Sequence, residues 1–275
     1  MQNLEKYLIE NETLPKIKKF ANLGGKELFN KKLKYLVNLA EEEKWNQTDI
    51  HTNEENSTIF YYILHTFDRC FDQNKIFITE DETNAYFNTG LMTKKGEEII
   101  GKFIRNNFHD PYDVNSNYWF FKEFILDNSR SFMDECNIKL EIATYFDDFN
   151  ELYFNPNLDI VINFEHIYKD NYERLPNELQ SMEIEIAKYV FEGYLNFTKK
   201  KIMRNNRIPV PQFYKNKIMF LIPVRVFDSK TIVIALEKIN DTYRGNTILS
   251  VGMAYNCARL LYKPESDWLL NSFIK

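Results

Sequence analysis

The sequence predicts a mixed α+β protein with a largely antiparallel central sheet and helices packed against it. Segments with apolar residues at helical spacing are interspersed with short runs of β-branched and aromatic residues. Hydrophobic residues make up 44% of the 275 residues and aromatic residues 16%, so the chain can bury a sizeable, ring-rich core. We expect residues 1–32 to form a helical leader and residues 33–275 a single domain.

Composition and charge narrow the class of protein. The net charge of −5 gives no overall attraction for phosphate, so nucleic-acid binding would need a local patch. No apolar run reaches about 18 residues, no signal peptide is recognised, and Cys70, Cys136 and Cys257 lie far apart. We therefore expect a cytoplasmic protein with free thiols and no membrane partner. No metal-ligand spacing, P-loop or dinucleotide fingerprint is found, so we expect no metal and no cofactor.

In the first half, helical spacing predicts a helix from Leu33 to Trp45 and a second one over 58–74. Two short runs, 75–79 and 84–90, flank an acidic turn and predict a hairpin.

The next two segments are harder to assign. The segment 94–107 (KKGEEIIGKFIRNN) reads as a short amphipathic helix. The segment 118–126 (YWFFKEFIL) fits either a helix or a strand, because periodicity alone does not separate the two.

The second half predicts further strands and the longest helix. We expect strands at 138–143 and at 158–164, and the nearly continuous apolar run of the latter favours a central position. A helix over 178–204 would bury the stripe Leu179, Met182, Ile186, Val190, Tyr194 and Phe197. Its basic end, Lys199 to Arg207, fits either phosphate binding or the C-terminal end of a helix dipole.

A C-terminal hairpin follows, formed by strands around Asp228-Ser229-Lys230. We pair Arg225 with Val233, which places only apolar side chains on the even-numbered face. The odd-numbered face is mixed, with Arg225 and Glu237 among apolar residues, and forms either the floor of a ligand cleft or a surface covered by another element. Pro223 cannot donate to a ladder and predicts an edge strand or a bulge.

A last helix begins near Gly252. We expect Met253, Ala254, Cys257 and Leu261 to face inward, and Tyr255 and Arg259 to form another ridge with Asn256 beside them. A tyrosine and an arginine suit stacking on a base and pairing with a phosphate, and equally a structural cation–π contact.

Other candidate site residues lie at loops and strand ends. Asn88 and Thr89 either form a turn or present polar groups to a ligand. Gln212 and Tyr214 precede the C-terminal hairpin. His109 in a loop and His166 after a strand are possible acid–base groups.

Several motifs together resemble a bacterial family known as domain of unknown function 3825, over roughly residues 33–270. The motifs, in order, are ELF…LVNLAEEEKW, FYYILHTFDRC, YFNTGL, VPQFY, LIPVRV and TILSVGMAYNCARLLYKPESDWL. Family members are sometimes joined to RNA-associated modules such as cold-shock or LOTUS-type domains. The resemblance therefore implies an RNA-related role, and supplies no catalytic mechanism.

The leading hypothesis is an RNA- or nucleotide-binding protein, with RNA preferred, whose cleft lies on the odd-numbered face of the C-terminal sheet. Arg225 and Arg259 would contact phosphate, and Tyr214 and Tyr255 would stack on bases. One alternative is a metal-independent nuclease or phosphodiesterase that uses His166 or His109. Another is a protein-interaction module, such as a phage or host-defence inhibitor. The sequence specifies no reaction.

Overall fold

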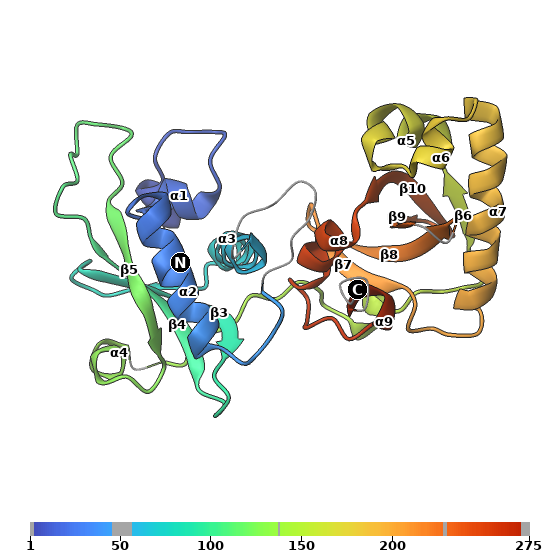
Figure 1. Ribbon diagram of the computed structural model, residues 1–275. Coiled ribbons are helices and arrows are strands. Elements are labelled where there is room, and N and C mark those ends of the chain that lie inside the picture. The colour runs from blue at the N-terminus through green and yellow to red at the C-terminus, as the bar shows by residue number, and fades with distance from the viewer. Residues whose placement is uncertain (1–2, 46–56, 137, 228–229, 271–275) are drawn as a thin grey trace. The chain divides into compact units, whose positions relative to one another are not determined.

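The protein is described by a computed structural model that covers residues 3–45, 57–136, 138–227 and 230–270 (Figure 1). It is an α+β protein with two five-stranded sheets, which confirms the predicted fold class. The contacts divide the chain into two compact units, with the boundary between Thr144 and Tyr145. Each unit holds one of the two sheets, and each is described by itself. The single domain expected over 33–275 stays a prediction.

The first unit contains a sheet of strand order β1-β5-β4-β3-β2. Strands β2 to β5 are antiparallel, and the short β1 is parallel to β5. In chain order its elements are η1 (Leu4–Tyr7), α1 (Lys16–Phe20), β1 (Ala21–Asn22), α2 (Gly25–Leu39), α3 (Ser57–Asp72), β2 (Ile76–Ile78), β3 (Asn84–Met92), β4 (Glu98–Arg105), β5 (Trp119–Leu126) and α4 (Arg130–Glu135). The expected leader thus gives this sheet one of its strands.

Aromatic rings fill the layer between this sheet and helices α1 to α3. The ring of Phe103 on β4 lies 5.2 Å from Phe20 of α1, 5.5 Å from Phe67 of α3 and 5.2 Å from Phe121 of β5, between ring centroids. Only glycine fits at position 101, two residues before Phe103, because a Cβ there would come within 2.1 Å of the Phe87 ring. The opposite face of the sheet packs against Phe132 of α4.

Two sequence-based predictions in this unit are wrong. The segment 94–107 is not a helix, because β4 (Glu98–Arg105) occupies its centre. Apolar residues cover both faces of this strand: Phe103 faces the helices and Ile100 faces α4, so the run lacks the alternation of a half-exposed strand. The segment 138–143 is also not a strand in the described residues.

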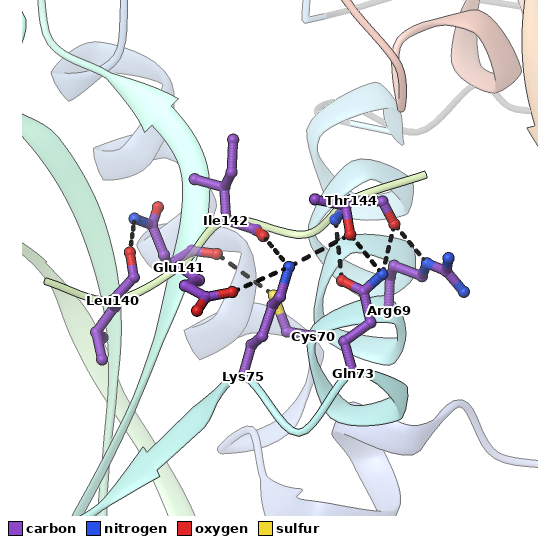
Figure 2. Close-up of polar contacts among 9 residues, drawn as sticks. Arg69, Cys70, Gln73, Lys75, Leu140, Glu141, Ile142 and Thr144 are labelled. Atoms are coloured by element: carbon purple, nitrogen blue, oxygen red, sulfur yellow. Dashed lines mark hydrogen bonds and ion pairs between the residues drawn. The ribbon is translucent and has the colours of Figure 1, made fainter. Parts of the chain in front are cut away.

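The extended segment Leu140–Thr144 is held by side chains rather than by a β-ladder (Figure 2). The Gln73 amide accepts from the Thr144 N–H (2.9 Å) and donates to the Thr144 carbonyl (2.6 Å), as a neighbouring strand would. Lys75 donates to the Ile142 carbonyl (2.9 Å), and the Asn88 amide donates to the Leu140 carbonyl (3.0 Å). Side chains therefore bind every second carbonyl of this segment, up to the boundary between the units.

We expect Gln73→Ala to loosen this segment. Three hydrogen bonds between Gln73 and Thr144 would be lost, because the Gln73 amide also donates to the Thr144 hydroxyl at 2.8 Å. At a net cost of about 0.5–1.5 kcal/mol each, local opening should become at least roughly tenfold more frequent. Limited chymotrypsin cleavage after Tyr145 or Phe146 measures this opening. Glu80→Ala, in the exposed turn between β2 and β3, serves as the control. Equal cleavage rates in the two variants would show that Gln73 does not hold the segment.

The second unit contains a sheet of strand order β6-β10-β9-β8-β7. All neighbours are antiparallel except β6 and β10, which are parallel. In chain order its elements are η2 (Phe149–Leu152), β6 (Asp159–Ile162), α5 (Phe164–Asp170), η3 (Tyr172–Arg174), α6 (Asn177–Gln180), α7 (Ile184–Ile202), β7 (Val210–Tyr214), β8 (Lys217–Val226), β9 (Lys230–Ile239), β10 (Thr242–Leu249), α8 (Val251–Ala258) and α9 (Asp267–Leu270).

The predicted hairpin is present with a register shifted by two residues. Arg225 pairs with Thr231, whereas Val233 pairs with Pro223. A two-residue shift keeps every side chain on its predicted face. The even-numbered residues of β8 and β9 accordingly form a buried core with helices α5 to α7, as predicted. Pro223 was expected to mark an edge strand or a bulge, but β8 lies between β7 and β9 and its ladder with β9 has no register shift. Strand β7 pairs with β8 only as far as Leu221, so Pro223 has no ladder partner on that side.

Two further predictions in this unit need correction. Strand β6 (Asp159–Ile162) lies at the edge of the sheet rather than at its centre, and its Val161 is exposed. In α7 the buried residues are Ala187, Phe191, Leu195, Thr198 and Ile202, whereas Ile186 and Phe197 of the predicted stripe are exposed. The other four residues of the predicted stripe do contact the core: Leu179 is buried, and Met182, Val190 and Tyr194 are partly buried against it. The prediction is therefore wrong for Ile186 and Phe197, and it missed the fully buried row through Ala187 and Phe191.

Candidate functional site

The orientation of α8 differs from the prediction. Ser250 caps the helix, accepting a hydrogen bond from the Met253 N–H at 3.2 Å. The helix buries Ala254, Tyr255 and Ala258 against the odd-numbered face of β8 and β9. Tyr255 is 1% exposed, so it is a core residue in this structure and its ring is not open to a ligand. Asn256 and Arg259 are half-buried.

Three other predicted site residues are also buried. Asn88 supports its own turn, because its Oδ1 accepts from the Gly90 N–H (2.9 Å) and Gly90 has a left-handed φ of 71°. The Thr89 hydroxyl donates to the Ile99 carbonyl at 2.6 Å. Gln212 is 2% exposed, and among the described residues its Oε1 has no hydrogen-bond partner. These side chains stand inside the protein rather than on a binding surface.

The predicted cleft face is divided into two halves. In one half, Val210, Leu221, Val233 and Ala235 pack under α8 and α9. In the other half, cross-strand pairing brings Tyr214 beside Lys217, and Met219, Glu237 and Arg244 side by side on neighbouring strands. Helix α8 contacts the β7 side of the sheet (Figure 1). The cleft prediction therefore fails for the covered half, whereas the second half presents several polar groups to solvent.

We define the hairpin patch as Tyr214, Lys215, Lys217, Glu237 and Arg244. Tyr214 is 52% exposed, and the Lys215 ammonium lies 5.4 Å from the centre of its ring. Lys217 pairs with Glu237 at 2.5 Å, and Arg244 is exposed beside Glu237 on β10. Lys215 and Asn216 both have left-handed φ values, 48° and 60°, as a tight two-residue hairpin turn requires. The turn thus presents an aromatic ring between two lysines.

Three residues of the hairpin patch, Tyr214, Lys215 and Lys217, lie in a stretch of unusual charge. Residues 193–227 contain eight Lys or Arg residues and no Asp or Glu. A chain of net charge −5 with +8 in this stretch has −13 in all its other residues. Such an asymmetry concentrates positive potential on one part of the second unit.

Of the two charged residues predicted on the odd-numbered face, Arg225 lies outside the hairpin patch and Glu237 lies within it. Arg225 is exposed and lies at the far end of β8, opposite Thr231 on β9. Glu237 belongs to the hairpin patch and neutralises part of its charge through Lys217.

The two candidate histidines do not share a site, because they belong to different units. His109 Nδ1 lies 3.0 Å from the Ser116 carbonyl within the loop between β4 and β5. His166 Nδ1 lies 3.1 Å from the Asp170 carboxylate, one turn along α5. The residues that the structure describes contain no group of three metal-ligating side chains.

Cys70 and Cys257 also lack the character of nucleophiles. Burial raises the pKa of the Cys70 thiol to about 12 and that of Cys257 to about 11. A thiol with so high a pKa carries very little thiolate at neutral pH.

Lys215, Lys217 and Arg244 are not among the site residues predicted from the sequence. Lys215 and Lys217 could have been found from the absence of carboxylates over 193–227, which is visible without a structure. Arg244 could not, because only the pairing of β10 with β9 brings it beside Glu237.

Comparison with known proteins identifies the family to which the chain belongs. The model of the family "Domain of unknown function (DUF3825)" matches residues 36–268, which is most of the chain and agrees with the predicted resemblance. The chain belongs to this family. No curated protein and no solved structure matches it. None of the helices in the described part of the chain has the length and apolarity to span a bilayer.

Proposed function

We propose that the protein binds single-stranded nucleic acid, RNA in preference, through the hairpin patch. The observation that carries this proposal is the exposed ring of Tyr214 between Lys215 and Lys217, within a carboxylate-free stretch. The preference for RNA rests on the RNA-associated modules to which the family resemblance points.

Each part of the patch has a counterpart in a single strand. An exposed aromatic ring offers a stacking surface to any base, worth about 1–3 kcal/mol per base. Lysine and arginine side chains beside it attract the phosphates on either side of that base. The exposed half-face of the sheet replaces the cleft under α8 as the place of binding, because Tyr255 and Gln212 are buried.

Tyr214→Ala is expected to weaken binding about 5- to 150-fold, the equivalent of one lost stacking contact. Fluorescence anisotropy with a labelled oligouridine of about 12 nucleotides, at fixed salt, measures this. Tyr214→Phe should bind like the wild type, because the ring is retained.

Tyr189→Ala is the matched control, since Tyr189 is an exposed tyrosine on α7 outside the patch. Equal affinities for Tyr214→Ala and Tyr189→Ala would reject the hairpin patch as the stacking site. Absence of binding by the wild type would reject the function. A DNA oligonucleotide of the same sequence tests the preference for RNA.

The other hypotheses stay predictions. Gel analysis of the same RNA after incubation tests for nuclease activity, and loss of cleavage in His166→Ala or His109→Ala would favour the enzyme. A pull-down from the native host addresses the protein-interaction module.

A further inference from the structure

A second positive surface lies at the C-terminal end of α7. We define the basic end of α7 as Lys200, Lys201, Arg204 and Arg207, all of which are exposed. None of the ion pairs between described residues involves these four side chains, although lysines and arginines elsewhere in the described chain pair with carboxylates. In a chain of net charge −5, this is an uncompensated cluster of cations.

Helix capping accounts for only part of the cluster. The Arg204 guanidinium donates to the Lys200 carbonyl at 2.6 Å, which satisfies one group at the helix end. The helix dipole favours cations within the last turn, which ends at Ile202. Arg207 lies beyond that turn, and the Lys201 ammonium lies 4.4 Å from the centre of the exposed Phe197 ring. The basic end of α7 thus has an exposed aromatic ring beside cationic side chains, as the hairpin patch does.

The basic end leads directly to the strand that carries the hairpin patch. The connection from α7 to β7 is fixed by the Ser266 hydroxyl, which donates to the Arg207 carbonyl (3.0 Å), and by the Trp268 indole, which donates to the Ile208 carbonyl (2.8 Å). Strand β7 is the edge of the sheet, with Arg207 before its start and Tyr214 at its end. Seven residues separate these two, so their Cα atoms lie at most about 25 Å apart.

We infer that the basic end of α7 is a second phosphate-binding site, and that the ligand is an oligonucleotide which runs along the β7 edge from this site to Tyr214. This inference rests on the proposed function. A stacked strand rises about 3.4 Å per nucleotide, so roughly seven nucleotides cover the greatest possible separation. Strand β7 alone spans about 13 Å from Val210 to Tyr214, whereas a stacked trinucleotide spans about 7 Å, so a mononucleotide or a trinucleotide is too short to reach both places.

The salt dependence of binding tests this inference. Each phosphate contact to a single strand adds about 0.7 to the slope of log affinity against log salt concentration. The variant Lys200→Gln/Lys201→Gln/Arg204→Gln/Arg207→Gln should therefore lower that slope by about 2 to 3 for an oligouridine of about 12 nucleotides. With a trinucleotide as ligand, the same variant and the wild type should have equal slopes, because so short a strand does not reach the basic end of α7.

The control removes the same charge elsewhere. Lys26, Lys31, Lys34 and Lys95 are exposed in the first unit, and the variant with all four changed to Gln should keep the wild-type slope. The melting temperature of each variant checks that it is folded.

The outcomes separate the two proposals. If the wild type binds and Tyr214→Ala weakens binding, but the slope is unchanged in the α7 variant, the second site is rejected and the function stands. An equal fall in both four-residue variants is a general charge effect, and also rejects the second site. If the wild type does not bind, the proposed function fails first.

Discussion

Replacing Phe103 by alanine is expected to destabilise the first unit by about 3–5 kcal/mol, the usual cost of deleting a buried ring. Phe103 is 0% exposed and lies among the rings of Phe20, Phe67 and Phe121, at centroid distances of 5.2 to 5.5 Å. These side chains come from a helix, a second helix and a neighbouring strand, so no single element can move to fill the cavity. Aromatic pairing adds to the loss.

Urea unfolding followed by tryptophan fluorescence measures the effect, because Trp119 is buried in the same unit. Phe108→Ala is the matched control, since Phe108 is 92% exposed in the loop after β4, and its stability should stay within about 0.5 kcal/mol of the wild type. A loss below about 1 kcal/mol for Phe103→Ala would show that the ring cluster does not support the sheet.

Strand faces could be predicted from the sequence even where the register could not. Side chains alternate along a strand, so the two-residue error in pairing Arg225 left Ile222, Val224 and Ile234 on the core face. The failure at β4 has the opposite cause. Both faces of that strand are covered, so alternation is lost and Ile99, Ile100, Phe103 and Ile104 imitate a helix.

Helix orientation was less predictable, because one residue turns a helix face by about 100°. In α7 the predicted row through Ile186 and Val190 is adjacent to the buried row through Ala187 and Phe191. In α8 the same ambiguity moved Tyr255 from the expected outer ridge into the core. Alanines at 254 and 258 allow the helix to approach the sheet closely on that side, a reason that depends on the packing partner rather than on the helix alone.

The sequence predicted one residue of the candidate site, Tyr214, but not which side chains lie around it. Tyr214 was singled out from the sequence as a stacking residue, and the structure places it on the exposed half of the predicted face. Its neighbours are set by a series of strand pairs. β7 pairs with β8, β8 with β9 and β9 with β10, which carries Arg244, and no local pattern encodes that series.

Tyr255→Ala is expected to distinguish a core residue from a binding residue. Tyr255 is buried between α8 and the odd-numbered face, in contact with the cluster of Leu221, Val233 and Ala235. Its removal should lower the free energy of unfolding of the second unit by about 3 kcal/mol or more. The folded variant should bind the oligouridine within about twofold of the wild type, because the hairpin patch is unchanged.

The pair Tyr255→Ala and Tyr214→Ala makes this test sharp. Tyr214 is 52% exposed, so its removal should cost less than about 1 kcal/mol of stability while weakening RNA binding. Thermal unfolding and anisotropy on the same samples therefore give opposite results for the two tyrosines. If Tyr255→Ala instead kept its stability and lost RNA binding, the ridge of α8 would be the binding surface, and the hairpin patch would not.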